Sequence, residues 1–200
     1  MISRSFWEDT HFGPSQPAED RDHLTREAIL AAHQHGQRVN ILTKAGKLSK
    51  ARDQVRSLLP LLGRDDIFGV TLTCLDEDHR EFWEPNAAPT WVRVDNLKLA
   101  HDLGIQTRAS LEPVLYPEQT LELIRLIRPF TDLIQVGKLN VHAGDPPEVL
   151  EREKAIDWPA FGHYAWELLR SMPGMWYVKA DLAREVGVTG GMGLRGSTLG

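Results

Sequence analysis

Cysteine is nearly absent from this 200-residue sequence, in which Cys74 stands alone. A single cysteine excludes an internal disulfide, and it excludes any metal or cluster site that needs three or four cysteines from this chain. The sequence has no run of about 18 apolar residues, which excludes a membrane-spanning helix. Its first ten residues, MISRSFWEDT, contain no apolar signal-peptide core. We therefore expect a cytoplasmic protein.

Several common functional signatures are missing as well. There is no G-x-S-x-G elbow for a serine nucleophile, and the eight histidines show no H-E-x-x-H spacing for zinc. The net charge of -5 argues against broad electrostatic binding to nucleic acid. The tail contains a formal G-x-G-x-x-G at Gly191, Gly193 and Gly196, but too few residues follow it for the helix that a dinucleotide site requires. We expect residues 187–200 to form a flexible, glycine-rich tail.

Strand and helix patterns alternate along residues 1–186, which we interpret as one domain. Apolar, β-branched segments predict strands at 38–43, 67–73, 105–112, 132–140 and 175–179, with a weaker candidate at 2–6. Helical patterns between them end near residues 34, 62, 103, 128 and 172, whereas the polar run 141–154 favours a loop. Strict alternation of strands and helices predicts a parallel sheet.

Polar residues at alternate strand positions narrow the fold class. In the strand at 105–112, Arg108, Ser110 and Glu112 alternate with smaller or apolar residues. A doubly wound sheet is buried on both faces and should show continuous apolar strands. A closed eight-unit barrel typically needs about 250 residues. The pattern therefore predicts a partial (β/α) barrel, an incomplete TIM-like barrel whose lumen holds a ligand.

Seven polar residues fall at or near the carboxyl ends of four successive strands. They are Lys44, Thr71, Thr73, Arg108, Glu112, Lys138 and Asn140. Ligand sites of parallel α/β folds lie at this edge. A structural salt bridge between Arg108 and Glu112 would explain two of the seven residues but not the rest. We therefore expect a ligand site at the carboxyl edge of the sheet.

The order of these segments resembles a known family. The pieces VNILTKAG, DDIFGVTLTCLDEDHREFWEPNAAPTWVRVDNLKLAHDLGI, EPVLYP, IQVGKLNVH and WYVKADL are similar to radical SAM proteins, most closely the spore photoproduct lyase and DNA repair photolyase-like branch. The resemblance extends over about residues 16–182. It implies a partial barrel that binds S-adenosylmethionine across the strand ends. It also implies a [4Fe-4S] cluster that cleaves this cofactor to a radical.

The resemblance also implies roles for individual residues. Lys44 resembles the lysine that meets the cofactor carboxylate, and Thr71 and Thr73 resemble a strand end near the ribose. Arg93 matches an arginine that follows the EPNAAP loop, while Arg108 and Glu112 belong to the cofactor-facing wall. Lys138 and Asn140 match a strand that faces the substrate cavity.

The sequence departs from this family at one essential point, because the CxxxCxxC segment that should hold the cluster is absent. We therefore expect a C-terminal portion of a radical SAM protein, with the first strand and cluster loop missing, that is inactive alone. A missing N-terminal segment or a partner chain would then carry the cluster. Two alternatives are a cluster-less paralogue, acting as a nucleoside-like ligand-binding or regulatory module, and a different α/β barrel.

Overall fold

One sheet organises the chain, as a computed structural model of residues 24–46, 54–188 and 191–195 shows. The strands are β1 (Asn40–Thr43), β2 (Ile67–Thr71), β3 (Gln106–Leu111), β4 (Leu133–Val136), β5 (Gly174–Val178) and β6 (Gly191–Arg195). They are ordered β1-β2-β3-β4-β5-β6. The first five are parallel, and β6 is antiparallel to β5. The strand candidate at 2–6 lies outside the described residues.

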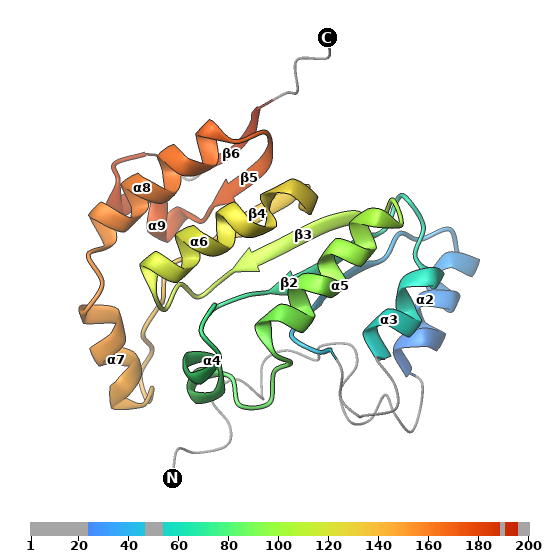
Figure 1. Ribbon diagram of the computed structural model, residues 1–200, viewed down its shortest axis with the longest axis horizontal. Helices are drawn as coiled ribbons and strands as arrows, with labels where there is room; N and C mark the ends of the chain where they lie inside the picture. Colours follow the sequence, from blue (N-terminus) through green and yellow to red (C-terminus); the bar gives the residue numbers. More distant parts are fainter. Residues whose placement is uncertain (1–23, 47–53, 189–190, 196–200) are drawn as a thin grey trace.

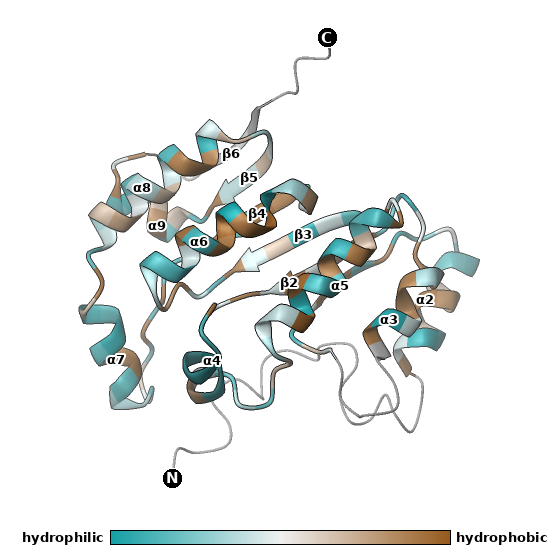
Figure 2. Cartoon of the chain, in the orientation of Figure 1, coloured by the Kyte–Doolittle hydropathy of each residue, from teal (hydrophilic) through white to brown (hydrophobic). Residues whose placement is uncertain are grey.

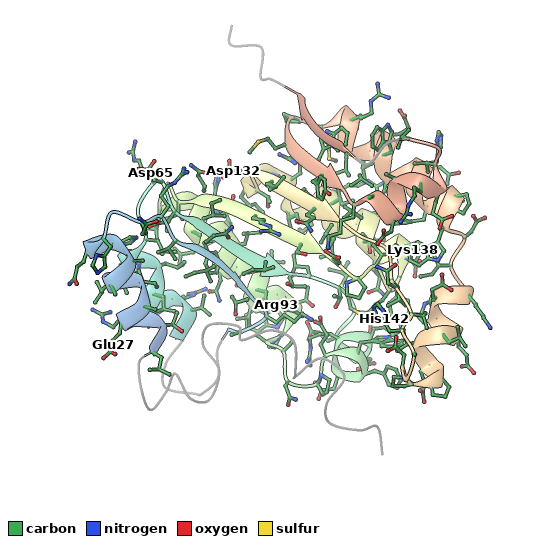
Figure 3. The ribbon with its side chains drawn as sticks, turned by 180° about the vertical axis from the view of Figure 1, so that it is seen from behind. Glu27, Asp65, Arg93, Asp132, Lys138 and His142 are labelled. Atoms are coloured by element: carbon green, nitrogen blue, oxygen red, sulfur yellow. The ribbon has the colours of Figure 1, made fainter. Side chains whose placement is uncertain are left out.

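Helices connect the parallel strands in sequence. They are α2 (Leu24–Gln34), α3 (Gln54–Leu58), α4 (Glu77–Trp83), α5 (Thr90–Asp102), α6 (Pro117–Ile127), α7 (Pro147–Lys154), α8 (Trp158–Ser171) and α9 (Ala180–Glu185). Short 3-10 turns at Leu59–Leu61 and Arg128–Phe130 extend α3 and α6. Helices α5 and α6 lie in front of the sheet in Figure 1, and the strands lie in front in the reverse view of Figure 3. Sequential strand order with helices on one face confirms the partial (β/α) barrel.

The core lies between the sheet and this helical layer. Phe68, Val70 and Ala109 of the strands are at most 1% exposed, as are Leu97 of α5 and Leu123 of α6. Figure 2 shows the same division on the helices, whose apolar stripes alternate with hydrophilic ones. No helix in the described part of the chain is long and apolar enough to cross a membrane.

Two segments differ from the sequence predictions. Helix α7 forms within the polar run that favoured a loop, because Pro147 begins it, Glu148 lies in its first turn and Val149 is buried. Within the tail expected to be flexible, Gly191–Arg195 forms β6 on the edge of the sheet. Gly193 pairs with Trp176, whose ring occupies the space that a side chain at 193 would need.

Candidate functional site

The register of the sheet places the polar strand positions on the face opposite the helices. Gly69 pairs with Arg108, and two residues further along Thr71 pairs with Ser110. Ser110 in turn pairs with Gln135. Successive side chains of a strand point to opposite faces, so Thr107, Ala109 and Leu111 share the other face, toward the helices. Arg108, Ser110 and Glu112 therefore face the lumen, as their alternation indicated.

A buried ion cluster closes the ends of β1 and β2. Glu84, whose side chain is 3% exposed, pairs through Oε1 with Lys44 Nζ at 3.0 Å and through Oε2 with Arg93 Nη1 at 2.9 Å. Arg93 Nη1 also donates to the carbonyl oxygen of Thr71 at 2.6 Å. Burial acts to raise the pKa of Glu84, but the charges of Arg93 and Lys44 outweigh it and hold the pKa below its ordinary value of 4.5. Lys44 is thus held at the strand edge by an ionised carboxylate.

The loop after α4 builds this cluster, because its backbone is tied to the strands on either side. The amide of Ala88 donates to the carbonyl of Lys44 at 2.9 Å. Arg80 Nη1 donates to the carbonyls of Glu84 and Ala87, each at 3.1 Å. The hydroxyl of Thr90, the first residue of α5, donates to the carbonyl of Cys74 at 2.8 Å. These bonds fix the loop against the ends of β1 and β2.

Of the residues expected to bind the cofactor at this edge, Lys44 is partly exposed, whereas Thr73 and Arg93 are buried. Lys44 is about one third exposed, at 31% of its side chain, and lies where a ligand can reach it. The Thr73 hydroxyl is buried beside Glu84 and Cys74, and has no hydrogen-bond partner of normal geometry among the described residues. Arg93 is 0% exposed, so it supports Glu84 and the end of β2 instead of touching a ligand directly.

A second cluster crosses the lumen face of β3, β4 and the end of β5. Arg108 Nη2 donates to Gln135 Oε1 at 2.7 Å, and Gln135 Nε2 donates to Glu112 Oε2 at 3.1 Å. The other oxygen of Glu112 is paired with Lys179 Nζ. Gly137 lets the Glu112 side chain lie across it, since a Cβ at 137 would be 2.9 Å from Glu112 Cδ. Arg108 and Glu112 therefore form no direct salt bridge; Gln135 links them.

Lys138 and Asn140, which the resemblance assigns to the substrate cavity, are paired with residues of α7 and α9. Lys138 Nζ pairs with Glu185 of α9 at 2.6 Å and with Glu153 of α7 at 3.3 Å. Asn140 Nδ2 donates to Asp181 of α9 at 3.0 Å. Figure 3 shows Lys138 well apart from Arg93. Strand β4 ends at Val136 and not at 140 as expected, so both residues lie in the segment that follows the strand.

The thiol of Cys74 does not fit an iron–sulfur cluster. It is 0% exposed, and burial raises its pKa to about 12, so it is a thiol and not the thiolate that binds iron. Among the described residues, no group of three or more His, Cys, Asp or Glu side chains is placed to hold a metal ion. The [4Fe-4S] cluster expected of the family therefore has no ligand set in the described part of this chain.

Three residues of the two clusters escaped the sequence analysis: Glu84, Gln135 and Lys179. Gln135 left a signal as a polar residue within an apolar strand, and Lys179 directly follows β5. Glu84 opens the EPNAAP loop, but nothing in the sequence relates it to Lys44, which lies 40 residues earlier.

Comparison with known proteins supports the fold. No family model and no curated protein matches the chain. The crystal structure of Streptococcus suis SuiB bound to S-adenosylmethionine matches with a TM-score of 0.58 and 14% identity, covering 81% of this chain and 38% of that one. SuiB bound to its precursor peptide SuiA matches with a TM-score of 0.56 and 14% identity, covering 80% of this chain and 36% of that one. The chain thus spans well under half of SuiB, and the likeness shows that it shares the fold of that part of SuiB.

Proposed function

We propose that this chain is the S-adenosylmethionine-binding part of a radical SAM enzyme. The observation that carries the proposal is Lys44, held by the buried Glu84–Arg93 pair at the carboxyl edge of a partial barrel. A protein of the same fold, SuiB, has been solved with S-adenosylmethionine bound. Ligand sites of parallel α/β folds lie at this edge.

The chemistry of the edge suits this cofactor. The methionyl end of S-adenosylmethionine carries a carboxylate, and the partly exposed Lys44 ammonium is a cation that can form a charge-assisted hydrogen bond to it. The Thr73 hydroxyl is buried beside Glu84, so it supports this edge from within the protein, as Arg93 does. Thr71 and Arg93 keep these groups in place from within the protein.

Radical chemistry requires cysteines that this chain does not contain. Cys74 is the single cysteine, and its buried thiol is unsuited to iron. We therefore infer that another segment or a partner chain brings the cluster, and that the chain alone cleaves no cofactor. The EPNAAP loop and the VGKLN segment favour the spore photoproduct lyase-like branch. The net charge of -5 does not favour nucleic acid as the substrate.

Calorimetric titration with S-adenosylmethionine tests the binding role. We expect a dissociation constant in the micromolar range, and Lys44→Ala should weaken it about 10- to 100-fold by removing a charge-assisted bond. Lys98→Ala, which removes an exposed lysine paired with Asp102 on α5, is the matched control. No heat at millimolar cofactor would refute the binding role.

The alternative is a module that binds a nucleoside-like ligand and performs no chemistry with any partner. The burial of Cys74 is the observation that favours it. Co-expression with a cysteine-bearing segment, followed by reduction, separates the two ideas. Formation of 5′-deoxyadenosine by the pair supports the enzyme, whereas binding without cleavage in a cluster-loaded pair supports the module.

A further inference from the structure

We infer that Arg108 is the anchor of a second binding site in the lumen, which takes the carboxylate or phosphate group of the substrate. The inference deepens the proposed function. The oxyanion site is argued independently of that function, but the identification of its ligand as a substrate rests on it. The sequence analysis assigned Arg108 to the cofactor. Its surroundings in the structure favour a different ligand, for three reasons.

The first reason is charge. The lumen cluster contains two cations, Arg108 and Lys179, and one carboxylate, Glu112, so these side chains carry one net positive charge. The carboxylate is already paired with Lys179. Among the described residues no carboxylate lies within 4.0 Å of the Arg108 guanidinium, whose one hydrogen bond there goes to the neutral amide of Gln135. The positive charge of Arg108 is therefore not balanced by a carboxylate within this cluster.

The second reason is hydrogen bonding. The Nε atom of Arg108 is buried and has no partner among the described residues. Buried polar groups of folded proteins are nearly always paired, so an unpaired donor on a cation calls for an acceptor. The guanidinium presents its donors as a planar fork that matches the two oxygens of a carboxylate or phosphate. An oxyanion supplies both the missing charge and the missing acceptor.

The third reason is preorganisation. Gln135 accepts from Arg108 with one end of its amide and donates to Glu112 with the other, so neither group is free to turn. Glu112 is itself fixed by Lys179 and by its passage over Gly137. The head of Arg108 is thus oriented before any ligand arrives, which lowers the entropic cost of binding.

The position of Arg108 separates it from the cofactor lysine. Thr43 pairs with Val70, so Lys44 is level with Thr71 and Ser110, whereas Arg108 lies two residues deeper on β3. Ordinary strand spacings place its backbone roughly 7 Å deeper and roughly 10 Å across the sheet from Lys44. Two cations at such an offset can serve two acceptors, one on the cofactor and one on the substrate.

Side-chain NMR of the full chain labelled with ¹⁵N-arginine tests the site, with sodium phosphate and sodium glutarate as probes and sodium chloride at equal ionic strength as reference. We expect the Arg108 Nε–Hε resonance, assigned by its loss in Arg108→Gln, to shift saturably with phosphate or glutarate but not with chloride. Response to phosphate alone would indicate a phosphorylated substrate, and response to glutarate alone a carboxylate.

The variants separate this site from the cofactor site. Protection against thermal unfolding by the responding oxyanion should need about 10- to 100-fold more probe in Arg108→Gln, and less extra probe in Arg108→Lys, which keeps the charge but loses the fork. Arg125→Gln, an exposed arginine of α6, should respond like the unaltered chain. Absence of a saturable shift overturns the inference. The inference is also overturned if there is no oxyanion response and Arg108→Gln weakens the binding of S-adenosylmethionine as much as Lys44→Ala does. That result leaves the proposed function standing. If the chain responds to the oxyanion but binds no S-adenosylmethionine, the second binding site stands and the proposed function is refuted.

Discussion

Glu84→Gln should be among the most destabilising single changes in this chain. The substitution keeps the shape of the side chain and removes the charge between Lys44 and Arg93. Arg93 is 0% exposed, so its guanidinium would remain buried without a carboxylate. Breaking a buried ion pair from one side typically costs about 3 to 5 kcal/mol. The amide oxygen of Gln can still accept from Arg93, so we expect about 3 kcal/mol, the lower end of this range.

The dependence of the free energy of unfolding on acid pH should also report the Glu84–Arg93 pair. The pKa of Glu84 is lower in the folded chain than its ordinary value of 4.5, so the carboxylate stabilises the fold above about pH 4.5. This contribution is lost as the pH falls through the lower pKa of the folded state, because the folded state must then take up a proton on a group that prefers to be ionised. Glu84→Gln has no such proton to bind, so its stability should fall less steeply with acid over this window.

Urea unfolding followed by circular dichroism, at pH 7 and at steps down to pH 3, measures both effects. Glu122→Gln, on the exposed face of α6, is the matched control and should change the free energy of unfolding by less than about 0.5 kcal/mol. The double variant Glu84→Gln with Arg93→Met should be less destabilised than the sum of the two single variants, because it leaves no buried charge uncompensated. Additive losses, or a Glu84→Gln effect equal to that of the control, would refute the role of the pair.

Three further predictions concern other parts of the fold. Cys74, with a pKa of about 12, should have roughly one thiolate in 10,000 molecules at pH 8, so a disulfide reagent should label it at least 100-fold more slowly in the native chain than in urea. Gly193→Ala should cost about 1 to 3 kcal/mol and alter the fluorescence of Trp176, because the new Cβ would lie 2.0 Å from the ring; unchanged stability and fluorescence would contradict the packing of β6. Asp66→Asn should lower the free energy of unfolding by about 2 to 3 kcal/mol, since the carboxylate accepts from two backbone amides and contacts His33 at 2.9 Å; a loss below about 0.5 kcal/mol in urea would refute this role.

The strand order and the lumen face could be predicted because each depends on local rules. Alternating strand and helix patterns imply sequential parallel strands, and the two-residue period of β3 assigns Arg108 and Glu112 to one face. The same rule does not reach Lys138 and Asn140, because β4 ends at Val136 and not at 140 as expected. A polar pattern is informative only as far as the strand extends.

The support of the site could not be predicted because it depends on contacts between distant segments. Arg93 lies in the first turn of α5, where a charged side chain is ordinarily solvated, and no sequence rule indicates that its guanidinium is fully buried. Its burial is tolerated because Glu84, the Thr71 carbonyl and the Thr90 hydroxyl surround it. Gln135 likewise gains its importance from Arg108 and Glu112, both more than 20 residues away.

The charge of the lumen wall bears on the choice of ligand more directly than the charge of the whole chain. The chain has a net charge of -5, yet its two clusters contain four cations, Lys44, Arg93, Arg108 and Lys179, against the two carboxylates Glu84 and Glu112. Lys44 and Arg93 share Glu84, and Lys179 is paired with Glu112, which leaves Arg108 as the cation of the second cluster without a carboxylate partner among the described residues. A nucleic acid backbone requires an extended basic surface, which an acidic chain does not favour. The Arg108 guanidinium, which has no carboxylate partner among the described residues, instead matches one small ligand that brings a single oxyanion, as an acidic substrate would.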